Sequence, residues 1–443
     1  MLTRTPDSNV SRAVCAALPF PIRVFWYINV VMAVVCGVVI ALNRYVFHLG
    51  QGVHWQPYTS PFLPWGHFCD FWNFHDRFDF YHTKQFYSTT AGSIFSYPAP
   101  LSLLYAIFFT PKQYEHSIFT VATTIPLFVF LYFLFRAMVR RGISPKTAAL
   151  FAASSFVFSY PFWFEWELGN IEICVFIIVA CGILAWVRGH LYVAAVLLGI
   201  AGSMKIFPFV YLALFLSRKQ YRQFAAGIMA AVILYPISIW LACPSFAVAI
   251  PGIKASSRAM GVGLLPIWDW VLANVDHSLW SFYKQAMHML GYRNERPLWE
   301  LSAYVDITAV AGLLAYFFLI RRRPMLNQLM CLSIASILLP PMSNDYTLLY
   351  LYLPWGLLIL STIDGCRVGK LRPGTLTAFV CFGFLMSAES EIVIHGAAIA
   401  GQFKAILLLV LFYIALKYPF DLPSDARAQE IETQAPALSE LTA

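Results

Sequence analysis

The chain has 443 residues, of which 60% are hydrophobic, 17% aromatic and only 12% charged. Soluble domains carry about 25% charged residues, so this composition excludes an ordinary soluble protein, whose surface needs more polar groups than this chain has. The formal net charge of +8 is typical of a membrane protein whose Lys and Arg lie in cytoplasmic loops, and it does not indicate a nucleic-acid partner.

Apolar runs about as long as the ~20 residues that cross a bilayer recur along the chain. They predict an all-α polytopic integral membrane protein with about twelve transmembrane helices, all within residues 24–418. The first run, 24–42, is longer than the ~7–15 apolar residues of a signal peptide, so we expect it to remain as an anchor. The predicted spans are 24–42, 117–139, 147–163, 171–187, 191–204, 206–217, 222–242, 301–320, 326–340, 346–363, 374–388 and 398–417.

Lys and Arg concentrate in alternate short connections, which the positive-inside rule places in the cytoplasm. We therefore expect a plasma (inner) membrane protein with both termini cytoplasmic. The N-terminal tail would be residues 1–23, and the polar C-terminal tail, residues 419–443, would be disordered. Two large loops, 43–116 and 244–300, then face the periplasmic or extracellular side.

Two short segments interrupt the pattern of spans. Residues 99–110, APLSLLYAIFFT, are too short to cross, so we expect a helix that lies in the outer interface. The runs 191–204 and 206–217 meet at MKIFP, where Pro208 lacks a backbone donor and breaks the helix. Broken helices at membrane depth are tolerated where they line a cavity, so this break is a candidate site.

The first outward loop contains a stretch rich in charges and rings, FCDFWNFHDRFDFYHTKQFY, at residues 68–87. Asp70 has apolar neighbours on both sides, so partial desolvation is expected to raise the pKa of its carboxyl group. A raised pKa suits a general base that works near neutral pH. The rings also fit an interfacial belt, and simple solvation is the favoured interpretation for Asp76, Arg77 and Asp79.

Three further groups of residues occur in a fixed order along the chain. The first comprises Asp70-Phe71, Phe86-Tyr87, FSYPAP from Phe95 to Pro100, and Pro111. The second, residues 167–222, comprises Gly169-Asn170, the small residues from Gly199 to Gly202, Lys205 with Pro208, and the basic end Arg218-Lys219. The third is LLPPMSNDYTLLYLYLPW, from Leu338 to Trp355.

Together these groups, which extend over roughly residues 20–360, resemble the polyprenol-phosphate-dependent glycosyltransferases of the GT-C superfamily. The greatest similarity is to glycosyltransferase family 87, the mannosyltransferase-like group. The sequence departs from that pattern where Ile171-Glu172 follow Gly169-Asn170 and where YPAP replaces the commoner YPP. Segment 244–300 matches nothing in the family pattern.

The resemblance implies a GT-C-type fold and a transferase that moves a hexose such as mannose. Its expected partners are a polyprenyl-phosphate sugar donor, a lipid or glycan acceptor on the outer face, and membrane lipids. It also implies an aspartate in the first outward loop as general base, and Asp70 holds that position. No cofactor and no metal are expected, since the spacing of Glu389, Glu391 and His395 fits no metal-ligand set.

The donor leaves as a lipid phosphate, so positive charge is expected where that negative charge develops. Lys205 is the first candidate, because a lysine at membrane depth is costly and is a functional hypothesis by default. The alternative is that its side chain snorkels to the interface. Weaker candidates, for which simple solvation is the alternative, are Arg258, His82 and Lys84.

Polar and aromatic residues at the predicted outer ends of spans are candidates for binding the sugar or the acceptor: Glu167, Asn170, Trp166, Asn344 and Asp345. Each also has a purely structural interpretation. Asn170 fits a helix N-cap, Trp166 fits the interfacial belt, and Asn344 or Asp345 fits a cap after the preceding prolines.

A lipid or glycolipid transporter or flippase without covalent chemistry is the alternative function. Transporters tend to contain inverted repeats and charges within their spans, whereas here the polar residues gather on the predicted outer face. A single disulfide between Cys69 and Cys243 is left open, since the nine cysteines form no disulfide framework.

Overall fold

The computed structural model describes residues 17–42, 69–72, 74–88, 95–110, 113–263, 265–268, 273, 275–292, 295–387, 393–394, 397–398 and 400–423. These residues are almost entirely helical, which confirms the all-α prediction. A small antiparallel pair, β1 (Val393–Ile394) and β2 (Ala397–Ala398), accompanies the helices.

The helices follow one another along the chain with short connections. In order they are α1 (Phe20–Ala41), α2 (Cys69–Trp72), α3 (His75–Phe78), α4 (Leu101–Phe109), α5 (Glu115–Arg140), α6 (Pro145–Val157), α7 (Tyr160–Leu168), α8 (Glu172–Val187), α9 (Leu191–Met204), η2 (Phe207–Leu212), α10 (Ala213–Ser217), α11 (Tyr221–Ala242), α12 (Phe246–Gly263), α14 (Leu279–Met289), α15 (Leu298–Ala315), η3 (Tyr316–Ile320), α16 (Met325–Leu338), η4 (Asp345–Leu351), α17 (Tyr352–Arg367), α18 (Thr375–Met386) and α19 (Ala400–Lys417).

Among the described residues, six helices are long and apolar enough to cross a membrane, or seven if the bent pair α6 and α7 counts as one span. The chain is therefore a multi-pass membrane protein. The twelve predicted segments coincide with these seven units and with five apolar helices of 10–17 residues. At 1.5 Å per residue those five are shorter than the ~30 Å hydrocarbon core, so the structure supports six or seven candidate spans and does not show twelve.

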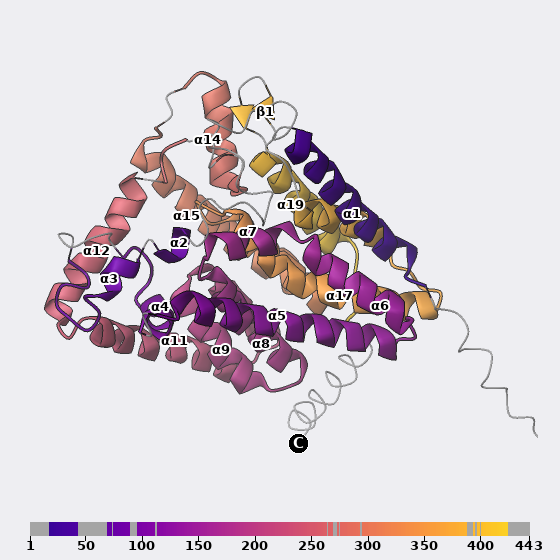
Figure 1. The fold of residues 1–443 in the computed structure, drawn as a ribbon, viewed down its shortest axis with the longest axis horizontal. Coiled ribbons are helices and arrows are strands. Elements are labelled where there is room, and N and C mark those ends of the chain that lie inside the picture. The colour runs from indigo at the N-terminus through magenta and orange to yellow at the C-terminus, as the bar shows by residue number, and fades with distance from the viewer. Residues whose placement is uncertain are drawn as a thin grey trace, which may run out of the picture.

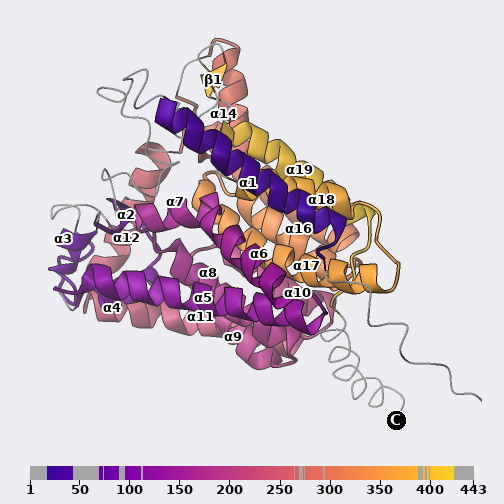
Figure 2. The same ribbon diagram turned by 45° about the vertical axis from the view of Figure 1, so that its right-hand side comes forward.

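The helices pack as two groups around a central element (Figures 1 and 2). In one group α1 lies along α18, which in turn contacts α19. In the other, α9 packs between α8 and α11. Between them runs the segment Asp345–Arg367, η4 and α17, which is the most buried of the candidate spans.

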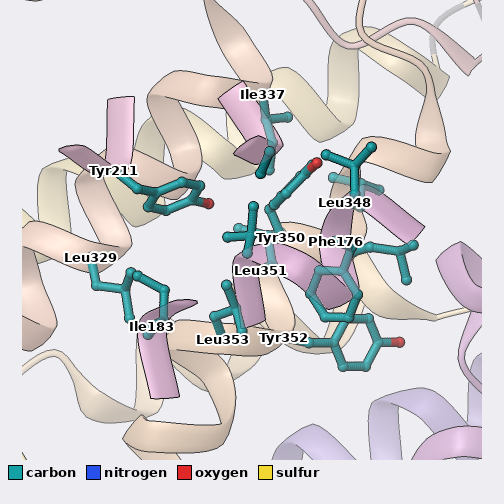
Figure 3. Packing of buried hydrophobic residues seen from close by; sticks show 14 of the residues in the cluster. Phe176, Ile183, Tyr211, Leu329, Ile337, Leu348, Tyr350, Leu351, Tyr352 and Leu353 are labelled. Carbon is teal, nitrogen blue, oxygen red and sulfur yellow. The ribbon is translucent and has the colours of Figure 1, made fainter. Parts of the chain in front are cut away.

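The core is centred on this segment (Figure 3). Tyr350 and Leu351 are fully buried, and Phe176, Tyr211 and Leu329 from three other helices lie around them. Because apolar side chains surround η4 on several sides, any polar group that it carries must find its partner inside the protein.

Both predicted interruptions are present. α9 ends at Met204, and a 3-10 helix, η2, begins at Phe207 with Pro208 as its second residue. Residues 101–109 form α4, a nine-residue helix that packs against α3, α5 and α11. The helix predicted within 99–110 is therefore present, as is the break after Met204.

The large predicted outward loop at 244–300 contains α12 and α14. Cys243, directly before this loop, is a free thiol. The side chain of Cys69, its possible disulfide partner, lies outside the described part of the chain. Glu389, Glu391 and His395 also lie outside the described residues, as do residues 1–16 and 424–443 of the two predicted tails. The first residues after α19 are packed, because the Phe420 amide donates to Asn327 Oδ1 at 2.7 Å.

Candidate active site

Asp70 lies on the short helix α2 and is held by a residue from the end of α7. Gly169 terminates α7 with φ +62°, a left-handed conformation that favours glycine, and the next residue is Asn170. Asn170 Nδ2 donates to Asp70 Oδ2 at 2.8 Å, while its Oδ1 accepts from the Glu172 amide at 3.0 Å. Asn170 precedes the N-cap residue Ile171, so it accepts from the first amide of α8 and also orients the Asp70 carboxyl group.

The environment of Asp70 raises the pKa of its carboxyl group above the ordinary aspartate value of 3.8. The main cause is burial, which disfavours the charged form. The hydrogen bond from Asn170 and the positive charge of Lys205 each oppose this rise. A carboxylate with a raised pKa is a stronger base than an exposed aspartate.

Lys205 lies at the break between α9 and η2, and its ammonium group is nearly enclosed. Its Nζ lies 3.0 Å from Glu172 Oε2, with side-chain exposed fractions of 9% for the lysine and 0% for the glutamate. The same Nζ lies 4.4 Å from the ring centroid of Tyr97 and 5.8 Å from that of Tyr346. Two aromatic faces and one carboxylate therefore stabilise this buried cation.

Two buried glutamates complete the polar cluster. Glu172 Oε1 accepts a hydrogen bond from the Tyr350 hydroxyl, so both of its oxygens contact a partner. Glu165, on α7, accepts from the Ile173 amide through Oε1 at 2.6 Å. Its Oε2 is buried and has no hydrogen-bond partner among the described residues, and the carboxyl group interacts electrostatically with Asp70 and Lys205.

Of the sugar candidates, Asn170 is in this cluster and the others are placed differently. Trp166 is half-buried, with its ring at 6.0 Å and nearly perpendicular to that of Trp163. The side chain of Glu167 lies outside the description. Asn344 is half-buried just before η4, and its Oδ1 has no hydrogen-bond partner among the described residues.

Asp345 is completely buried at the start of η4 and is surrounded by protein groups. Lys404 Nζ lies 2.5 Å from its Oδ1, and the Tyr160 hydroxyl donates to its Oδ2 at 2.9 Å. A sugar hydroxyl would have to displace one of these partners to reach either oxygen.

The other three phosphate candidates are exposed. Lys84 and Arg258 lie on the surface, on the first loop and on α12. His82 is tied to the end of α11, since its Nδ1 lies 3.0 Å from the Leu241 carbonyl oxygen and its amide donates to Ala242 O at 2.9 Å. Lys205 is thus the candidate cation that the structure encloses together with carboxylates.

The charges that follow Asp70 do not share one environment. Asp76 and Asp79 are exposed, as predicted, and the Asp76 side chain has an exposed fraction of 87%. Arg77 is fully buried, and the prediction that it is solvated is wrong. Its Nη1 donates to the backbone oxygens of Gln85 at 3.2 Å and Ser88 at 2.8 Å, so the carbonyls of the following turn draw it inward.

Sequence reasoning missed several members of the cluster. Glu172 was noted as a departure from the family pattern, although an acidic residue at a helix start after a capping asparagine is itself a signal. Tyr97 and Tyr350 lie inside the first and third sequence groups, but nothing in those groups singled them out as partners of Lys205 or Glu172. Among the described residues, no three His, Cys, Asp or Glu side chains are grouped as they would be to hold a metal ion.

Comparison with known proteins identifies the class of this site. The family model of glycosyltransferase family 87 matches residues 95–342, more than half of the chain. The protein is thus a membrane glycosyltransferase of the GT-C type. It belongs to glycosyltransferase family 87, as its sequence groups predicted. Asn170, Glu172 and Lys205 lie inside the matched segment, whereas Asp70 precedes it.

Neither the curated proteins nor the solved structures contain a match to this chain.

Proposed function

We propose that this glycosyltransferase moves a hexose such as mannose from a polyprenyl-phosphate donor to a lipid or glycan acceptor at the outer face of the plasma membrane. Asp70 is the general base of this reaction. The observation that carries the proposal is the partly buried Asp70 carboxyl group, which Asn170 orients and which lies within the electrostatic reach of Lys205.

In the proposed reaction Asp70 accepts the proton of an acceptor hydroxyl group. The hydroxyl oxygen then attacks the anomeric carbon of the donor, and the bond between that carbon and the phosphate oxygen breaks. The products are the glycosylated acceptor and a polyprenyl phosphate, with the proton on Asp70. General-base catalysis of this kind contributes about 10²–10⁴-fold to the rate.

Lys205 is the proposed contact for the donor phosphate, because its charge stabilises the oxyanion that forms as the bond breaks. In the structure that charge is already balanced by Glu172 at 3.0 Å. The phosphate must therefore share Lys205 with Glu172 or replace it. We propose that Asn170 and the rings of Tyr97 and Trp166 contact the sugar or the acceptor near this point.

The test is a transfer assay with purified protein in lipid nanodiscs and a panel of radiolabelled polyprenyl-phosphate hexoses. Asp70→Asn is expected to lower the transfer rate by about 10²–10⁴-fold. Asp76→Asn is the matched control, since it removes the same charge from an exposed side chain nearby, and its rate is expected to equal wild type. If Asp70→Asn transferred sugar at the wild-type rate, Asp70 would not be the general base.

One observation favours the alternative of lipid transport, namely that charged pairs are buried within apolar helices. The same preparations distinguish the two functions. If a labelled donor moved across the bilayer of proteoliposomes and no donor or acceptor gave a labelled product, the protein would be a transporter and not a transferase.

A further inference from the structure

The seven-residue helix η4 connects two buried ion pairs. All seven of its residues are buried, and it carries Asp345 at its first position and Tyr350 near its end. A 3-10 helix rises about 2 Å per residue, so these two side chains leave the helix about 10 Å apart along its axis. A small shift of η4 therefore moves both contacts together.

The first end of η4 is held by three segments that are distant in sequence. Lys404, from α19, lies 2.5 Å from Asp345 Oδ1, and the exposed fractions of the two side chains are 1% and 0%. His277 Nδ1 lies 3.4 Å from the same oxygen, and the Tyr160 hydroxyl of α7 donates to Oδ2. His277 Nε2 also lies 3.2 Å from Thr347 Oγ1, within η4 itself.

The remainder of η4 holds the proposed donor-phosphate lysine. The ring of Tyr346, the residue after Asp345, lies 5.8 Å from Lys205 Nζ. The Tyr350 hydroxyl donates to Glu172, which in turn pairs with Lys205 at 3.0 Å. Lys205 is thus held by two side chains whose places are fixed by η4, one directly and one through Glu172.

Stability alone does not account for the Lys404–Asp345 pair. The desolvation of two buried charges offsets most of their attraction, so an apolar pair of similar volume would stabilise the fold about as well. What a charged pair adds is geometry, because an ammonium group and a carboxylate meet in few arrangements.

We propose that Asp345, Lys404 and His277 are positioning residues, which fix η4 so that Tyr346 and Tyr350 hold the Lys205–Glu172 pair in place. The role of Lys205 as a phosphate contact rests on the proposed function, but the positioning itself does not. In this arrangement the three residues contact other protein groups. They act through η4.

The test is the double variant Asp345→Leu with Lys404→Met, which removes both charges of the pair so that no buried charge is left uncompensated, although Tyr160 and His277 lose their contacts with Asp345. Its first readout is the rate at which a small amine-reactive reagent modifies Lys205, followed by mass spectrometry of the protein in nanodiscs. This rate is slow where Lys205 is enclosed, and we expect it to rise at least about tenfold. The second readout is transfer kinetics, in which we expect the donor KM to rise about tenfold while kcat falls less.

The matched control removes another interhelical ion pair, Arg141 Nε to Asp364 Oδ1 at 2.9 Å. Asp364 lies on α17, which continues η4, but it comes 13 residues after η4 ends and so lies about 20 Å further along the helix axis. Arg141→Met with Asp364→Leu is expected to leave both the labelling of Lys205 and the donor KM unchanged.

The proposal is overturned if the Asp345 and Lys404 double variant melts like wild type and labels Lys205 at the wild-type rate. If that variant does not fold, Thr347→Val tests the proposal in its place, because it removes one hydroxyl contact of His277 and keeps every charge. We expect it to raise Lys205 labelling about two- to threefold, and an unchanged rate overturns the proposal. If the wild-type protein transfers no sugar but Lys205 is labelled faster in the double variant, the proposed function is wrong and the positioning role of Asp345, Lys404 and His277 still holds.

Discussion

Asn170 and Asp70, one hundred residues apart in sequence, are joined by a hydrogen bond of 2.8 Å from Nδ2 to Oδ2. The same asparagine accepts, through its Oδ1, from the first amide of α8. One side chain therefore fixes the start of a helix and stabilises the charged form of the proposed base. These two roles use different atoms, so substitution can separate them.

Replacing Asn170 is expected to shift the pH dependence of transfer. The proposed base acts when deprotonated, so kcat/KM falls as the pH drops through the pKa of Asp70. The bond from Asn170 lowers that pKa, and its loss in Asn170→Ala therefore raises the pKa and moves the acid limb to higher pH. The measurement is kcat/KM against pH between about 4 and 8.

Asn170→Ser is the control that separates the two roles. Its hydroxyl group can still accept from the Glu172 amide, but the side chain is too short to reach Asp70. We expect the same shift of the acid limb as in Asn170→Ala, while only the alanine variant loses the hydrogen bond to the Glu172 amide, which contributes about 0.5–1.5 kcal/mol. An acid limb that stays at the wild-type pH in both variants would refute the role of this bond.

Glu172→Gln tests whether a phosphate can take the place of the Glu172 carboxylate beside Lys205. Without ligand the variant is expected to lose about 3–5 kcal/mol of stability, because it leaves a buried ammonium group uncompensated. A bound phosphate would restore the missing negative charge. We therefore expect polyprenyl phosphate to raise the melting temperature of the variant by more than it raises that of wild type.

Unphosphorylated polyprenol serves as the control ligand for this measurement, since it has the same chain and no charge. It is expected to affect the two proteins equally. Equal stabilisation of both proteins by the phosphate as well would mean that it binds away from Lys205.

Arg77→Met is expected to loosen the turn that follows α3. The buried guanidinium group of Arg77 holds the carbonyl groups of Gln85 and Ser88, and hydrogen bonds to charged groups contribute about 1.5–3 kcal/mol each. Amide hydrogen exchange in residues 79–88 should therefore be about tenfold faster or more. Lys84→Met, which changes an exposed charge in the same turn, should leave exchange as in wild type.

The sequence predicted those parts of the structure that depend on local patterns. Long apolar runs marked the helices, and Pro208 marked the break beside Lys205. Asp70 was singled out because its apolar neighbours are adjacent in sequence. Each of these inferences uses residues that are neighbours along the chain.

What the sequence left out depends on packing between distant segments. Glu172 and Lys205 are on different helices, and their pairing needs α8 and α9 to lie side by side. Lys404 reaches Asp345 only because α19 packs near η4, and the burial of Arg77 depends on how the following turn folds. For the pair of Lys404 and Asp345, the signal in the sequence was a lysine within the apolar run of α19, since such a residue requires a buried partner.

The helices α9 and α11 are in close backbone contact at Gly199 and Gly227. A Cβ atom at Gly199 would lie 2.0 Å from the backbone oxygen of Gly227, so even alanine forces the two helices apart. Such overpacking costs about 1–3 kcal/mol or more, and Gly199→Ala should lower the melting temperature accordingly. Because α9 ends directly before Lys205, the donor KM should rise as well.

Gly37→Ala, in α1, is the matched control for Gly199→Ala. A Cβ atom at Gly37 meets nothing within 4 Å, and alanine is favoured over glycine in a helix by about 1 kcal/mol. The control should therefore melt at or above the wild-type temperature with an unchanged donor KM. If the two alanine variants behaved alike, α9 and α11 would not be in backbone contact, and the position of Lys205 would not depend on that contact.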